Sequence, residues 1–179
     1  IAPIHDLVFK RDDLVVATHG RSFWILDDLT PLHQITDAVA KSKMFLFKPR
    51  GAFRMRGRGH PRPNVGQNPP SGSVVYYYFK EKPKEAVTLE FLDAEGNLIR
   101  KFKSRKREEP EPEHKPPSMF QRSGPQNVFV EAGMNRFVWN IRYPDAELVP
   151  EAILWGGMLN GPIAVPGIYQ VKLTVGEKK

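Results

Sequence analysis

The chain has no cysteine among its 179 residues. This absence excludes a disulfide-stapled scaffold, a thiolate zinc site and a cysteine nucleophile, but it does not decide the compartment, since cysteine-free proteins occur in all of them. The sequence also lacks the apolar run of roughly 18 or more residues that a membrane-spanning helix needs. Its first ten residues have neither the basic head nor the long apolar body of a signal peptide. We therefore expect no membrane span.

Acidic residues are missing between Asp37 and Glu81, and this gap accounts for the positive charge of the chain. The whole chain has a formal net charge of +7, and the gap contains nine cations, so the rest of the chain is slightly negative. The basic charge is therefore a property of one segment and not of a folded face. The nine cations are Lys41, Lys43, Lys48, Arg50, Arg54, Arg56, Arg58, Arg62 and Lys80.

The first thirty residues predict three short strands in quick succession, over 4–9, 14–18 and 22–26. Each predicted strand is apolar on both faces, so neither face of the resulting meander is suited to water. A blade of a β-propeller has this property, because it is enclosed between neighbouring blades. We therefore predict that residues 1–30 are a propeller-blade fragment that needs cover on both sides.

Residues 31–72 predict a short helix followed by a connection. Thr30 and Pro31 are typical of a helix start, with a hydroxyl at the N-cap and proline in the first helical position. Apolar residues then recur at helical spacing, so we expect a helix over about 31 to 41. A small strand over 44–47 is followed by a basic Gly, Pro and Arg-rich linker that has almost nothing to bury.

Residues 73–179 predict an antiparallel β-sandwich of immunoglobulin-like type. Alternating apolar residues, hairpin turns and Pro/Gly-rich connections support this fold class, which makes the whole chain all-β. The segment 104–118 has no apolar side chain other than its prolines, and we expect a disordered or looped excursion there. The predicted strands cover 74–79, 87–92, 98–103, 135–143 and 168–175.

Two pairs of adjacent carboxylates, Asp12 with Asp13 and Asp27 with Asp28, are the first candidates for chemistry. A glycosidase needs two carboxyl groups roughly 5 to 10 Å apart on opposite sides of the scissile bond. Neighbouring residues of a strand point to opposite faces, so neither pair meets this need by itself. We predict turn and capping roles for them, and no catalytic residue in this chain.

A second candidate is a histidine and carboxylate network within the meander. His19 is expected one strand away from His5 and Asp6, so a His–Asp pair could form a general base or a metal ligand there. One carboxylate without a Ser or Cys nucleophile is too little for either, and we favour a structural network. Its expected members are His5, Asp6, His19, Arg21 and Asp27, with no metal and no cofactor.

The basic linker is the third candidate, because Arg alternates with Gly and Phe53 interrupts the run, as in segments that bind single-stranded nucleic acid. Anionic glycans, lipid headgroups or an acidic patch of a parent protein are other possible ligands. Nucleic acid is the less favoured partner, since no basic folded face accompanies the run. The residues expected to bind are Arg54, Arg56, Arg58 and Arg62.

Aromatic residues raise a fourth possibility, a platform for stacking sugars. Strand alternation sends Tyr76 and Tyr78 to one face and Tyr77 to the other, so at least one face is expected in the core, together with Trp139. Trp155 is the candidate for carbohydrate binding.

The run Thr18-His19-Gly20-Arg21-Ser22, followed by Trp24, stands out among the motifs of residues 4–8 and 13–28. With several later stretches, these residues resemble the closing propeller blade, and the region after it, of bacterial proteins with sortilin-like (VPS10-type) BNR repeats. These proteins are often catalogued as BNR-repeat glycosyl hydrolases. The Asp-box of the repeat is absent, because residues 20–24 lack its aspartate. The resemblance covers nearly the whole chain, through residues 4–8, 13–28, 68–70, 133–139, 142–144, 161–162 and 166–169.

The resemblance implies a noncatalytic C-terminal module of a larger secreted or cell-envelope protein, located outside the cell or in the periplasm. The module would close or brace the propeller and hold a partner, which is the remainder of the propeller, another protein chain or a glycan. Two alternatives are a supporting domain of a glycoside hydrolase and a carbohydrate-binding sandwich. An isolated meander would leave apolar side chains in water, so we also expect this chain to be part of a longer polypeptide.

Overall fold

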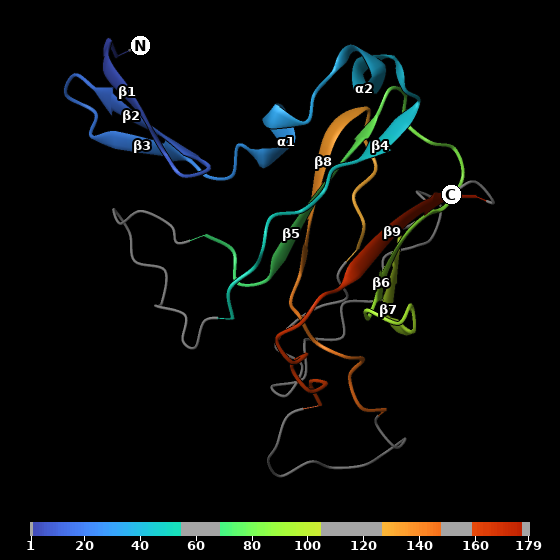
Figure 1. Ribbon diagram of the computed structural model, residues 1–179. Helices are drawn as coiled ribbons and strands as arrows, with labels where there is room; N and C mark the ends of the chain where they lie inside the picture. Colours follow the sequence, from blue (N-terminus) through green and yellow to red (C-terminus); the bar gives the residue numbers. More distant parts are fainter. Residues whose placement is uncertain (1, 55–68, 105–126, 148–158, 177–179) are drawn as a thin grey trace, which may run out of the picture.

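The computed structural model describes residues 2–54, 69–104, 127–147 and 159–176. Within these ranges the strands form three sheets of three strands each, and every strand pair is antiparallel (Figure 1). The two helices are four and five residues long. The prediction of an all-β chain with little helix is therefore confirmed.

The N-terminal sheet has the order β1-β2-β3 and consists of β1 (Ile4–Lys10), β2 (Asp13–Thr18) and β3 (Phe23–Leu26). Its strands follow one another through tight turns, and Gly20 has a φ of 74°, a left-handed conformation that glycine adopts without steric cost. The three strands predicted for the first thirty residues are therefore present. Figure 1 shows this sheet set apart from the other two and joined to them through α1.

The prediction of one continuous helix over 31–41 is wrong, because two short helices occupy this range. They are α1 (Thr30–His33) and α2 (Asp37–Lys41). The interruption has two local causes: the Gln34 side chain bonds both the N–H and the C=O of Lys48, and the Thr36 hydroxyl accepts from the N–H of Val39 and so starts a new helix. The short stretch thus bridges the N-terminal sheet and the rest of the chain.

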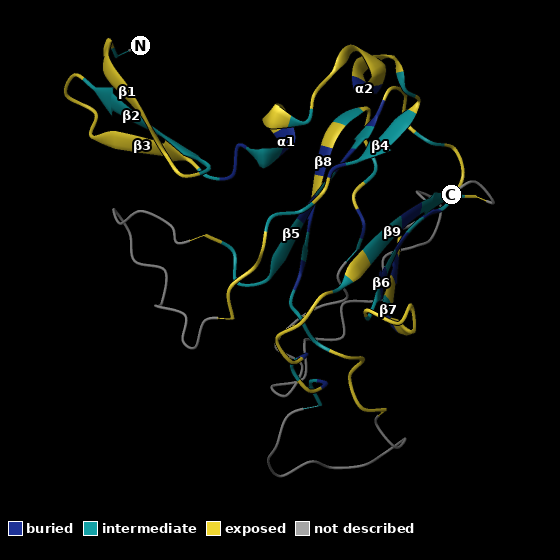
Figure 2. Ribbon diagram, viewed as in Figure 1, coloured by how far each residue is buried: buried dark blue, intermediate teal, exposed yellow. Residues whose placement is uncertain are grey.

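The two remaining sheets face each other. The β5 sheet has the order β4-β5-β8, with β4 (Met44–Leu46), β5 (Ser73–Phe79) and β8 (Gly133–Trp139). The β6 sheet has the order β7-β6-β9, with β7 (Leu98–Lys103), β6 (Val87–Leu92) and β9 (Gln170–Val175). Alternate residues of both sheets point into one shared core, which appears as the dark segments of β5, β6 and β8 in Figure 2.

Aromatic rings join the two sheets across this core. The ring centroids of Phe91 and Trp139 are 4.6 Å apart and stacked, and those of Phe102 and Phe137 are 4.7 Å apart. Contacts of this kind stabilise a core beyond the area that they bury. The expectation that Trp139 is a core residue is confirmed, since only 2% of it is exposed.

Tyr77 is the inward member of the tyrosine run, as strand alternation predicts. It is fully buried, and its hydroxyl donates to the backbone oxygen of Phe129 over 2.6 Å. Burial raises the pKa of this phenol above its ordinary value, because the charged form would lose its hydration. Tyr77 is thus a structural residue, whereas Tyr76 and Tyr78 are half-buried on the other face.

The strand predicted over 135–143 is wrong at its C-terminal end, since β8 stops at Trp139. Ile141 has a φ of 55°, which interrupts the extended backbone. Arg142 instead forms an isolated bridge with Ile163, and its guanidinium donates to the backbone oxygen of Gly161 over 2.7 Å. Tyr143, the last residue of the predicted strand, is exposed.

Candidate interaction surface and cavities

The first face of the N-terminal sheet is made of two rows of apolar side chains. The strand registers place Leu7 opposite Val16 and Val16 opposite Trp24, and they align Phe9, Leu14 and Leu26 in the same way. Trp24 is 62% exposed and Phe9 is 69% exposed. Residues in register across antiparallel strands share one face, so these six side chains form a continuous apolar surface.

The second face of the same sheet is also apolar. Val8, Val15 and Ile25 are in register there, beside Ala17 and Phe23. Phe23 is 74% exposed and Ile25 is 60% exposed. The yellow and teal colours of β1, β2 and β3 in Figure 2 show that neither face is covered by the rest of the described chain. The N-terminal sheet therefore presents apolar side chains on both of its faces.

The outer face of the β6 sheet is different, because charged side chains pair with one another there. The Glu90 carboxylate accepts from Lys101 over 2.7 Å and from Lys172 over 2.9 Å. These two hydrogen bonds lower the pKa of Glu90. A carboxylate with a lowered pKa stabilises the fold when the pH is above its ordinary pKa. This contribution, which is small at the surface, is lost as the pH falls through the lowered pKa. This face is suited to water, unlike the faces of the N-terminal sheet.

The paired carboxylates lie at the junction between the N-terminal sheet and the rest of the chain. Asp13 accepts from the N–H of Asp28 over 2.9 Å and from the guanidinium of Arg50 over 3.2 Å. Asp28 accepts from the N–H and the hydroxyl of Thr30. Thr30 therefore donates to Asp28 instead of capping α1. These contacts fit the turn and capping roles that we predicted for the aspartates.

The five residues of the predicted network lie on the N-terminal sheet and its end, but the geometry is not that of a His–Asp pair. The rings of His5 and His19 stack with centroids 5.1 Å apart. Asp6 accepts from the adjacent N–H of Leu7. Arg21 contributes its backbone oxygen to the indole N–H of Trp24, and Asp27 lines a small cavity. Among the described residues, no group of three or more His, Cys, Asp or Glu side chains could hold a metal ion.

Only one of the basic residues predicted to bind a partner can be placed. Arg54 is exposed and lines a cavity next to Phe53. The other three, Arg56, Arg58 and Arg62, lie outside the described residues, and so does Trp155, the candidate for carbohydrate binding. The same applies to almost all of the excursion predicted at 104–118, of which only Ser104 is described.

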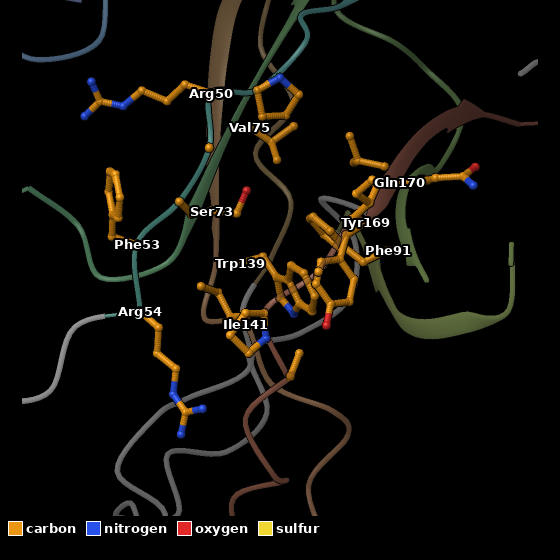
Figure 3. A pocket seen from close by; sticks show the side chains of 18 of the residues that line it. Arg50, Phe53, Arg54, Ser73, Val75, Phe91, Trp139, Ile141, Tyr169 and Gln170 are labelled. Carbon is orange, nitrogen blue, oxygen red and sulfur yellow. The ribbon is translucent and has the colours of Figure 1, made fainter. Parts of the chain in front are cut away.

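One cavity of the described chain was not predicted from the sequence. It has a volume of about 590 Å³ and lies at the end of the two facing sheets, and we call it the sheet-end cavity. Figure 3 shows Trp139, Tyr169 and Phe91 at its centre, with Arg50, Phe53 and Arg54 on one side. A smaller cavity of about 210 Å³ lies beside the junction and is lined by Asp27, Asp28 and Arg136 among others.

No strand pattern could have revealed the sheet-end cavity, because its walls come from parts of the chain far apart in sequence. Residues 48–54 form one wall, and residues 164–171 form the opposite one. The nearest signal in the sequence was Pro166 and Gly167, which interrupt a regular strand. The apolar residues Val165 and Ile168 lie on either side of them. Both apolar side chains are exposed.

No described helix is long and apolar enough to cross a membrane. A scan against protein-family models finds no match to this chain, and searches of the curated proteins and of the solved structures find none either.

Proposed function

We propose that this chain is a noncatalytic C-terminal module of a larger secreted propeller protein, in which it closes or braces the propeller and mediates binding to a protein or another ligand. The observation that supports this proposal is the N-terminal sheet, which is apolar on both faces and uncovered on both. The partner is the remainder of the propeller or another protein chain. The sortilin-like resemblance of residues 13–28 supports the same assignment and an extracellular, periplasmic or cell-envelope location.

The energetics favour a role in which both faces become buried. Fully burying one large apolar side chain contributes about 1.5 to 3 kcal/mol. Leu7, Phe9 and Trp24 on one face, with Phe23 and Ile25 on the other, are each more than half exposed. Neighbouring blades would bury both faces at once, which a single flat partner would not do.

The edges of the N-terminal sheet fit the same role. Within the described chain β2 pairs on both sides, whereas β1 and β3 each have one edge without a neighbouring strand. Propeller blades usually contain four strands, so one of these edges is available to a strand supplied by the propeller. We therefore interpret β1, β2 and β3 as a blade fragment, and the two facing sheets as an immunoglobulin-like sandwich that follows it.

Two other functions remain as alternatives with less support. A supporting domain of a glycoside hydrolase would have the same structure, and only the parent protein distinguishes it. A carbohydrate-binding sandwich would need an exposed aromatic row on one sheet, yet Tyr77 is buried and Tyr76 and Tyr78 are half-buried. The described part of the chain thus favours a bracing and binding role.

The proposal predicts that the gene encodes further sequence before Ile1, and producing this chain together with that sequence tests it. We expect that sequence to contain repeated three- or four-stranded units, and we expect the backbone amides of β1, β2 and β3 to exchange with solvent far more slowly in the longer protein than in this chain alone. Amides in β6 are the internal control and should exchange at the same rate in both. An upstream sequence without such units, or equal exchange in β2, would contradict the proposed function.

A further inference from the structure

The sheet-end cavity has a rigid apolar floor. Phe91 and Trp139 are each 2% exposed and stacked, and the ring of Tyr169 meets Trp139 edge-on with centroids 5.6 Å apart. The indole N–H of Trp139 donates to the backbone oxygen of Arg142, which fixes the ring. At about 590 Å³ the cavity is within the roughly 300 to 1,000 Å³ of small-molecule sites. The floor is therefore formed before any ligand arrives.

The rim of the cavity is both apolar and basic. Phe53, Val165 and Ile168 are 82%, 68% and 79% exposed, so apolar surface continues from the floor to the mouth. Arg54 and Lys48 are exposed cations on the same rim, whereas Arg50 is engaged by Asp13. No aspartate or glutamate is among the described residues that line the cavity. The charged side chains that line the cavity are therefore all cations.

The aromatic floor of the cavity offers few hydrogen-bonding groups to a sugar, although Lys48, Arg50, Arg54 and Gln170 are also among the lining residues. Ser73 and Tyr169 are the hydroxyl-bearing residues among its described lining, and the Tyr169 hydroxyl already donates to the backbone oxygen of Val165. A sugar would leave most of its hydroxyl groups without partners on this floor, which is unfavourable. An alkyl chain has no such requirement, and a carboxylate at its end would complement the cations of the rim.

We propose that the sheet-end cavity binds a small organic anion with an apolar body, such as a medium-chain carboxylate. The alkyl chain lies against Tyr169 and the exposed Ile168, above the buried ring of Trp139, and the carboxylate faces the exposed Arg54 at the mouth. The inference goes beyond the proposed function, because it concerns the sandwich and not the N-terminal sheet.

The probe is n-octanoate, titrated into the full chain by calorimetry, with 1-octanol as the uncharged ligand of the same length. We expect saturable one-to-one binding of octanoate. Replacing Arg54 by Gln should weaken octanoate about tenfold, as expected for losing one charge-assisted hydrogen bond, and should leave octanol unchanged. Arg21→Gln, an exposed arginine of the N-terminal sheet, is the matched control and should bind both ligands like the original chain.

Two further variants test the location of binding. Ser73→Phe places a ring in the cavity and should abolish octanoate binding, while thermal unfolding reports whether this variant is folded. Ile168→Asp puts a negative charge on an exposed rim position, so it should fold normally and weaken octanoate at least tenfold. Absence of octanoate binding, binding that survives Ile168→Asp, or equal loss in Arg21→Gln and Arg54→Gln would overturn the inference. None of these results bears on the upstream propeller, so the proposed function is tested separately.

Discussion

Replacing Trp139 by alanine is expected to lower the free energy of unfolding of the two facing sheets by about 3 to 5 kcal/mol. The indole is 2% exposed, stacks on Phe91 and lies against Tyr169, so its removal leaves a large cavity at the centre of the aromatic core. A loss of this size is a large fraction of the stability of a typical domain. Urea denaturation followed by far-UV circular dichroism measures the change.

Trp24→Ala is the control for this substitution. Trp24 is 62% exposed on the N-terminal sheet, so its removal should change the stability of the facing sheets by no more than about 0.5 kcal/mol. If Trp24→Ala destabilised those sheets as much as Trp139→Ala does, the N-terminal sheet would be part of the same core, and the separation described above would be wrong.

The second large effect is on association. Without a partner the two apolar faces of the N-terminal sheet should bind those of other copies, so the chain should form larger species as its concentration rises. A double variant, Trp24→Lys with Ile25→Lys, places one charge on each face and should remain monomeric at concentrations where the original chain associates. Sedimentation velocity over a concentration series measures this difference.

A matched double variant controls for the general effect of added charge. Leu98 in β7 and Phe129 in the segment before β8 are 56% and 69% exposed, so Leu98→Lys with Phe129→Lys adds the same charge away from the N-terminal sheet. This variant should associate like the original chain. Association that is lost equally in both double variants would show that the contact is not made by the N-terminal sheet.

Strand positions were predictable wherever apolar residues alternate or run continuously. Val87, Leu89 and Phe91 alternate with polar residues and are fully buried in β6, and the apolar runs of the first thirty residues form β1, β2 and β3. Helix and strand ends were less predictable, because side-chain bonds decide them. The Gln34 contacts with Lys48 that interrupt the helix join residues 14 apart, and periodicity carries no information on such contacts.

The candidate sites were harder to predict than the fold. The apolar character of both faces of the N-terminal sheet was predictable, because strands that are apolar on both sides are normally buried on both sides. The stacking of His5 on His19 joins the start of β1 to the turn after β2, and the apolar pattern of the strands does not specify such a contact. The sheet-end cavity depends on how residues 48–54 and 164–171 approach each other, which only the packed structure reveals.

Hydrogen exchange of the dilute, monomeric chain tests the central claim most directly, namely that the N-terminal sheet has no cover within the described chain. β5 and β6 are the central strands of the two facing sheets, and their amides over the buried core should be strongly protected. Amides of β2, although this strand is also paired on both sides, should exchange orders of magnitude faster, because little apolar contact opposes their opening. Protection of Val15 and Val16 equal to that of Leu89 and Tyr77 in the monomer would contradict the account.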